Sequence, residues 1–328
     1  MRMWTKKQKK ASGLFFLFVG LFLLVCNAIT PLFYRAMPND YVRTKLILST
    51  LSDSLACPEL VIFGNSRGMS GLDGYLLEER LENHPQVVSL TSTNQALCES
   101  SFYYDRLPAS TRIVVQCIDV EKLKEEVYLA DPNQVALRMY GYSLDECCRE
   151  WLPDRLIQDY TEWSVWVNYK ARNCLFAGLT TALRQWLDDD VIAGATATEL
   201  HYPRSTHTLR NTKVYDREIA ALNNDSTKYK QLTIAEEQQR LITGSMNYLQ
   251  QRGIALFYLL MPHNPDIRSF TQEERKAAVA LFRRTFPAAY TVDCVNLLEA
   301  EDFYDAIHLN EKGARKLTER LIQALSSE

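Results

Sequence analysis

The chain has 328 residues, enough to bury one large core or two small ones. Its formal net charge is -3 at pH 7, and a block of like charge occurs only within the first ten residues. This balance excludes the strongly basic proteins that bind nucleic acids through their overall charge.

The N-terminus predicts a membrane anchor. A basic stretch, "MRMWTKKQKK", precedes twenty uncharged residues from Ala11 to Thr30. As a helix they rise about 30 Å, the hydrocarbon thickness of a bilayer. The basic flank stays cytoplasmic, so the rest of the chain lies outside a cell membrane that it crosses once. The alternative is a cleaved signal peptide ending near "CNA", but the apolar stretch exceeds an ordinary signal core and favours the anchor.

The next segments alternate between strand and helix patterns. Residues 31–58 form a membrane-proximal segment that is helical in part. Short apolar runs typical of buried parallel strands are "ELVIFGNS", "QVVSL" and "TRIVVQCIDV". Helices are expected through "GYLLEERLENH" and near "ESSFYYDRL".

Residues 121–225 lack clear strands, and we interpret them as a largely helical insertion. It carries four tryptophans that could stack on sugar rings, although aromatic residues at helical spacing more often form core. They are Trp151, Trp163, Trp166 and Trp186.

After the insertion the alternation resumes. A long amphipathic helix over 234–253 has Gly253 at its C-terminal end. A strand over 254–262, a helix over 272–286 and a strand over 289–298 follow. Residues 59–328 are thus predicted to form a doubly wound α/β domain with a mainly parallel sheet in three layers.

The eight cysteines form no CxxC pair and no zinc-like spacing, so we expect neither a metal nor another cofactor. Cys98, Cys117 and Cys294 lie in apolar surroundings and are predicted core residues.

The sequence "GNSRG" fits a G-x-S-x-G turn, which exposes a serine hydroxyl between a strand and a helix. Ser66 follows the first strand of the domain, so it lies at the carboxyl edge of the sheet, where α/β sites form. An ordinary βα loop is the alternative for so short a motif.

The base that fits best is His308 in "DAIH", because Asp305 lies three residues earlier in the same loop. That spacing lets Asp305 accept a hydrogen bond from one ring nitrogen while the other nitrogen faces Ser66. Of the remaining histidines, His84 precedes Pro85 in a surface turn, and His201 and His207 lie in the polar part of the insertion. His263 ends a strand and could border the pocket, although an ordinary loop histidine is favoured. A serine nucleophile with His308 as base and Asp305 as its orienting acid is therefore predicted.

This order, with the serine first and a nearly adjacent acid and histidine last, resembles the SGNH (GDSL-like) hydrolase and acyltransferase superfamily. Its opening block is usually Gly-Asp-Ser, here "GNS", and its closing block is Asp-x-x-His, here "DAIH". The resemblance extends over 59–325 and covers the insertion poorly.

The resemblance also implies an oxyanion hole, and here the chain departs from the pattern. The second block normally offers a glycine amide, but "SLTSTNQALCES" has Asn94 at the best position. The third block's asparagine does not appear after "IVVQCIDV". The expected donors are the Ser66 amide and Asn94. Arg67 could contact an anionic acyl donor, or simply face solvent.

The basic terminus, single anchor and two motifs together resemble the membrane-anchored SGNH proteins of bacterial envelopes, including those of teichoic-acid D-alanylation and alginate acetylation. The resemblance implies acyl transfer or ester hydrolysis on a cell-surface polysaccharide or other polymer, in the periplasm or outside the cell, beside a multispanning O-acyltransferase. A catalytically inactive envelope protein that binds a glycan or such a partner is the alternative.

Overall fold

The computed structural model describes residues 6–36, 42–53, 57–129, 137, 149–161, 212–224 and 232–327. Its centre is a five-stranded parallel sheet in the order β2-β1-β3-β4-β5. The strands are β1 Leu60–Phe63, β2 Val87–Ser89, β3 Ile113–Ile118, β4 Ala255–Leu260 and β5 Tyr290–Asp293. The predicted α/β class with a parallel sheet is confirmed.

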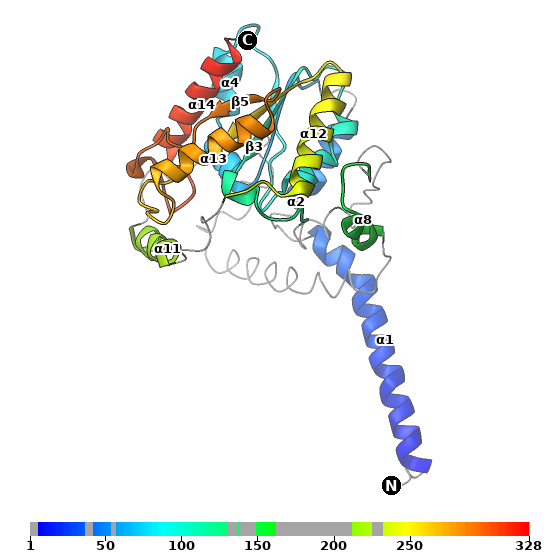
Figure 1. Cartoon of the computed structure of the whole chain (residues 1–328). Helices are drawn as coiled ribbons and strands as arrows, with labels where there is room; N and C mark the ends of the chain where they lie inside the picture. Colours follow the sequence, from blue (N-terminus) through cyan, green and yellow to red (C-terminus); the bar gives the residue numbers. More distant parts are fainter. Residues whose placement is uncertain are drawn as a thin grey trace.

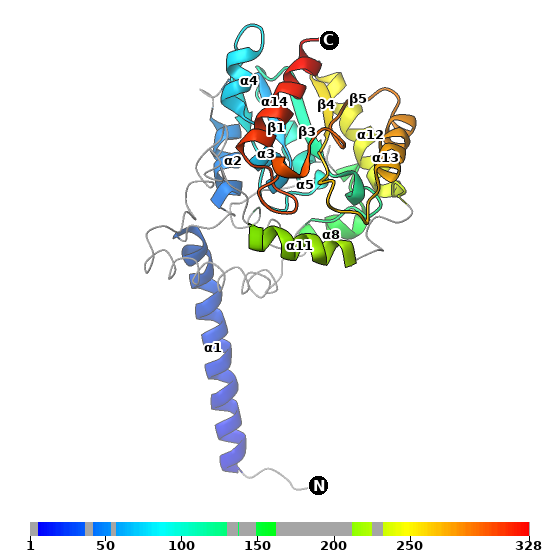
Figure 2. The ribbon, with the colours of Figure 1, turned by 90° about the vertical axis from the view of Figure 1, so that its left-hand side faces the viewer.

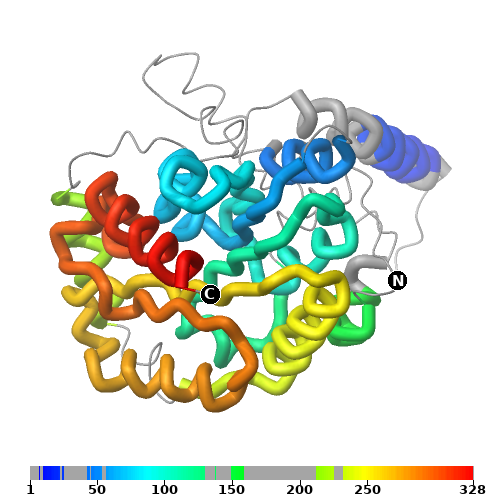
Figure 3. The backbone as a smooth tube through the Cα atoms, turned by 90° about the horizontal axis from the view of Figure 1, so that it is seen from above, coloured from blue at the N-terminus to red at the C-terminus, as the bar shows by residue number. Residues whose placement is uncertain are grey.

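Helices cover both faces of the sheet (Figure 3). The helices in chain order are α1 Lys6–Ala36, α2 Val42–Ser52, α3 Ser66–Gly71, α4 Gly74–Arg80, α5 Leu97–Ser101, α8 Asp154–Thr161, α11 Thr212–Asn224, α12 Glu236–Gln251, α13 Gln272–Thr285 and α14 Glu311–Leu325. Three short 3-10 turns occur at η1 Tyr104–Arg106, η2 Val120–Lys122 and η3 Ala300–Asp302.

Two apolar clusters, one on each face, explain this layering. Successive side chains of a strand point to opposite faces. Val61 and Phe63 of β1 therefore pack with α2, α5, α12 and α13, while Leu60 and Ile62 pack with α3, α4 and α14. Cys98, Cys117 and Cys294 are buried free thiols within these clusters, as predicted, and Cys57 is free and exposed.

Most predicted element boundaries agree with the structure. Helix α14 begins at Glu311, and Gly253 follows α12 with a φ of +70°, a left-handed conformation that suits glycine. The helix expected near "ESSFYYDRL" is wrong in extent, because α5 stops at Ser101. The three consecutive aromatic residues Phe102, Tyr103 and Tyr104 are all buried, which a helix with one apolar face does not permit.

Residues 31–58, predicted to be helical in part, contain α2, and buried Arg43 of this helix donates to the carbonyl of Ser89, the last residue of β2, at 3.0 Å. Within the described residues, no helix combines the length and apolarity needed to cross a membrane. The predicted anchor remains a prediction.

Much of the predicted insertion, with Trp163, Trp166 and Trp186, lies outside the described residues. Its described parts include α8 and α11. Trp151 is partly buried against Tyr248, with ring centroids 5.3 Å apart, so this tryptophan packs on α12 as core.

The carboxyl ends of the strands lie at the end of the domain from which α1 projects (Figures 1 and 2). Helix α14 starts at this end and runs to the C-terminus at the opposite end. Helix α11 lies across the same end, next to the loop that precedes α14. Every predicted site residue lies at this edge, either in a loop or at the start of α3.

Candidate active site

Ser66 is the first residue of α3 and directly follows the tight turn after β1. Gly64 in this turn has a φ of +154°, and a Cβ added there would lie 2.6 Å from Cys117 Cβ. The turn therefore requires glycine, both for its backbone conformation and for the close approach of β3. Asn65 is the N-cap of α3, and its Oδ1 accepts a hydrogen bond from the Arg67 amide at 3.0 Å.

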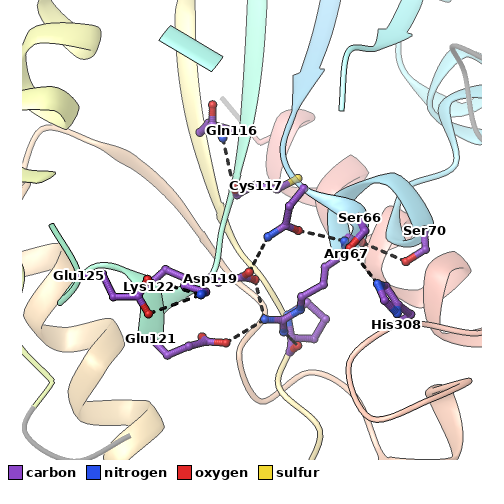
Figure 4. Close-up of polar contacts among 12 residues, drawn as sticks. Ser66, Arg67, Ser70, Gln116, Cys117, Asp119, Glu121, Lys122, Glu125 and His308 are labelled. Atoms are coloured by element: carbon purple, nitrogen blue, oxygen red, sulfur yellow. Dashed lines mark hydrogen bonds and ion pairs between the residues drawn. The ribbon is translucent and has the colours of Figure 1, made fainter. Parts of the chain in front are cut away.

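His308 lies in the loop between η3 and α14 and meets Ser66 across the sheet edge. Its Nε2 is 2.9 Å from Ser66 Oγ (Figure 4). Its Nδ1 is 2.8 Å from Asp305 Oδ2. The His308 side chain is 30% exposed, so a substrate can reach it. The structure thus brings these three predicted side chains together in one hydrogen-bonded series.

Asp305 is held as an anion. Its Oδ1 accepts from the amides of Ile307 at 2.9 Å and His308 at 2.7 Å. Burial raises the pKa of the Asp305 carboxyl, but the hydrogen bonds and charge of His308, with these amides, outweigh it and leave the pKa below its usual value. An ionised Asp305 fixes the tautomer with hydrogen on Nδ1, so Nε2 is free to accept the serine proton.

Two neighbouring segments hold the Asp305–His308 loop. The Ala306 carbonyl accepts from Asn264 Nδ2 at 3.2 Å, and the Ala306 amide donates to Glu218 of α11 at 3.3 Å. On the other side, Asn310 caps α14 through Gly313 at 3.0 Å and donates to the Glu301 carbonyl at 2.7 Å. Neither Asn264 nor Glu218 was predicted, because their partner is a backbone group that sequence does not reveal.

Asn94 lies on the loop after β2, which is bonded to the turn before Ser66. The Ser92 amide donates to the Gly64 carbonyl at 3.0 Å, and the Gly64 amide donates to Gln95 Oε1 at 2.7 Å. Asn94 is exposed with a φ of +56°, a conformation that Asn and Gly adopt most readily. In the described part of the chain its side chain makes no hydrogen bond, so its amide is available.

Arg67 does not fit the expected role in contacting an anionic substrate, nor does it face solvent. The residue is only 5% exposed. Its Nη1 lies 2.6 Å from Asp119 Oδ1 and 3.1 Å from Glu121 Oε1, and Nη2 donates to the Pro262 carbonyl. The two carboxylates, 52 and 54 residues away in sequence, satisfy the guanidinium inside the protein.

Asp119 and Glu121 belong to the site region but were not predicted. They directly follow β3, and a charged residue after a buried parallel strand is the sequence signal that could have found them. Burial raises the pKa of Asp119, and Glu121 adds to this, while Arg67 and the amide of Asn65 oppose it.

A small cavity of about 50 Å³ lies beside the turn and is lined by Asn65, Gln95 and Asp119 among others. Ser66 and His308 do not line it.

No protein-family model matches the chain, and no curated protein is similar enough in sequence to be matched.

Proposed function

We propose that this chain is an SGNH-type serine enzyme that transfers an acyl group to a cell-surface polymer, or hydrolyses its ester, through an acyl-serine intermediate. The observation that carries the proposal is the hydrogen-bonded series from Ser66 Oγ through His308 to Asp305, with distances of 2.9 and 2.8 Å. A nucleophile within reach of a base that a third group orients is the arrangement required for covalent acyl transfer.

In the first step, Ser66 Oγ attacks the acyl carbonyl carbon while His308 Nε2 takes the hydroxyl proton. The bond to the leaving group breaks, and His308 gives that proton to the departing oxygen. Asp305 stabilises the transient imidazolium. In the second step, His308 deprotonates a polymer hydroxyl or a water, whose oxygen attacks the acyl carbonyl carbon. The bond from that carbon to Ser66 Oγ breaks, and His308 returns the proton to Oγ.

The oxyanion is expected to rest on the Ser66 amide and on Asn94. The first amides of a helix have no partner within it, and the Asn65 side chain caps Arg67 rather than Ser66, which leaves the Ser66 N–H for the oxyanion. Asn94 lies on the loop that is bonded to this turn and offers an amide.

The proposed setting is the outer face of a cell membrane. The first ten residues are basic, and the next helical residues carry exposed apolar side chains, among them Leu14, Phe16, Phe18 and Leu24, each at least 67% exposed. The site lies at the end of the domain from which α1 projects. An acyl group that a multispanning acyltransferase transfers at the membrane would therefore have a short path to Ser66. The acceptor would be a cell-surface polysaccharide or another polymer.

One observation favours the alternative of an inactive protein that binds a glycan or such a partner. The position after β3, where the family has an asparagine donor, holds Asp119, whose side chain has no amide N–H to donate. A missing oxyanion donor costs about a hundredfold or more in rate.

A fluorophosphonate probe, which labels activated serines, separates the two. We expect the wild type to be labelled, Ser66→Ala not to be labelled, and His308→Ala to be labelled at least about a thousandfold more slowly. Ser70→Ala is the matched control, because this serine lies on the same helix with Oγ bonded to the Arg67 carbonyl. Absence of labelling in folded wild-type protein, or equal labelling of Ser66→Ala, would reject the enzyme and leave the binding protein.

A further inference from the structure

A buried polar cluster adjoins the nucleophile and takes no part in the proposed chemistry (Figure 4). Asn65 and Arg67, the two neighbours of Ser66 in the chain, contribute one side of it. Asp119 and Glu121, which follow β3, contribute the other. Arg67, Asp119 and Glu121 are each at most 7% exposed.

Arg67 joins the ends of three strands. It reaches from the turn after β1 to both carboxylates after β3 and to the Pro262 carbonyl after β4. The planar guanidinium presents donors in fixed directions, so these contacts define its orientation more closely than a lysine would. Burying this ion pair carries a desolvation penalty that can exceed its attraction, so stability alone does not account for its place beside the nucleophile.

The contacts of Asn65 with Arg67 and Asp119 fix the orientation of its side-chain amide. Its Oδ1 accepts from the Arg67 amide at 3.0 Å, which leaves Nδ2 to donate to Asp119 Oδ2 at 2.7 Å. Ser66 lies between two residues that are both tied to Asp119. Movement of the Ser66 backbone would therefore break at least one buried contact.

We propose that Asn65 and Asp119 are a positioning pair, in which the amide must donate and the carboxylate must accept, and that this pair holds Ser66 Oγ toward His308. The inference rests on the proposed function for its catalytic consequence. The pair also accounts for asparagine rather than aspartate at position 65. Both residue types can cap a helix, but a carboxylate at position 65 would lie against that of Asp119.

Exchanging the side chains at positions 65 and 119 tests whether the pair needs one amide donor and one carboxylate acceptor. Asn65→Asp places two carboxylates in contact and should slow fluorophosphonate labelling about 10- to 100-fold, the equivalent of one charge-assisted hydrogen bond. Asp119→Asn keeps an acceptor oxygen for Asn65 and should lose less. The double variant restores one donor, one acceptor and the original net charge, and should label within about threefold of the wild type.

The swap separates positioning from a general structural cost. If the cluster only stabilises the fold, the double variant should be at least as impaired as Asn65→Asp. Labelling of Asn65→Asp at the wild-type rate, or a double variant that labels no faster than Asn65→Asp, would overturn the proposal. Thermal unfolding of each variant corrects the rates for unfolded protein.

A second measurement does not depend on activity. The ¹⁵N resonance of His308 Nε2, assigned by its loss in His308→Gln, reports the hydrogen bond from Ser66. It should move in Asn65→Asp toward its position in Ser66→Ala and return in the double variant. If the wild type is not labelled, the proposed function fails, and this resonance alone decides the pair: an unchanged Asn65→Asp signal rejects it.

Discussion

His263 is 3% exposed at the end of β4, where its Nδ1 lies 3.3 Å from the Asn264 carbonyl and its ring packs edge-on against Phe270. Burial lowers its pKa from 6.5 to about 3, because the imidazolium loses its hydration. The charges of Arg67 and Arg275 lower it further, against the Asn264 carbonyl and Asp119. This histidine is therefore neutral in the folded protein at neutral pH.

The lowered pKa of His263 should make the free energy of unfolding depend on pH. Between pH 6.5 and about 3 the unfolded chain binds a proton at this residue and the folded chain does not. The free energy of unfolding should therefore fall as the pH falls through this window, by up to roughly 1.4 kcal/mol per pH unit from this residue. Urea denaturation at several pH values measures the slope.

The control for this prediction is the difference in this slope between the wild type and a variant that lacks the imidazole. His263→Gln should flatten the slope relative to the wild type. Equal slopes for the wild type and His263→Gln would contradict the assignment of a buried neutral imidazole.

Residues were predictable where a local motif carries them. Ser66 and the Asp305–His308 pair lie in short motifs. The three-residue spacing brings Asp305 to the His308 ring, and the position of Ser66 directly after the first strand placed it at the sheet edge where His308 also lies. The environment of Arg67 was not predictable, because its partners lie more than fifty residues away and sequence spacing says nothing of their approach. The Asn65–Asp119 contact was missed for the same reason.

Helix α14 shows how one element sets the position of the base. Its N-cap, Asn310, follows His308 by two residues and bonds both to Gly313 and to the Glu301 carbonyl. Gly313 lies so close to the loop that an added Cβ would be 2.2 Å from the Asp302 carbonyl oxygen. The start of the helix is therefore locked to the loop that carries His308.

Loss of this cap should affect both stability and labelling. Asn310→Ala removes two hydrogen bonds and should cost about 1–2 kcal/mol in the free energy of unfolding. It should also slow labelling per folded molecule, because the loop is released. Thr271→Ala removes the cap of α13, where Thr271 accepts from the Glu274 amide at 3.3 Å, and should reduce stability alone. If Asn310→Ala and Thr271→Ala are labelled at the same rate per folded molecule, the cap of α14 does not set the position of His308.

At the scale of elements, the periodicity of the sequence predicted every strand and the long helices, because buried parallel strands are nearly continuous apolar runs. It failed around α5, where aromatic residues enter the core from an irregular segment, and burial rather than local pattern decides the backbone. Strand β5 is also shorter than its apolar run, because a turn follows it in which the Leu297 amide donates to the Cys294 carbonyl at 3.0 Å.

The whole molecule joins an α/β domain to a helix whose described side chains are largely apolar and exposed. Leu17 and Leu21 are 68% and 61% exposed on α1, with no core of this chain over them. If α1 lies in a bilayer, as we propose, each charge introduced there should cost about 2.5–3.5 kcal/mol.

Liposome flotation tests this placement with the full chain. The wild type should float with vesicles, and Leu17→Asp combined with Leu21→Asp should shift protein to the soluble fraction. Paired Asp substitutions at exposed Tyr75 and Tyr290, on the domain, are the control and should leave flotation unaltered. A wild type that stays in the soluble fraction would contradict the anchor.

The hydroxyl of Ser66 and the imidazole of His308 are separated by 242 positions in the chain. During folding, the contact between Ser66 and His308 therefore forms only when α14, whose start holds the His308 loop, docks beside α3. If Ser66 is the nucleophile, as we propose, a chain in which this contact has not yet formed holds an unactivated serine.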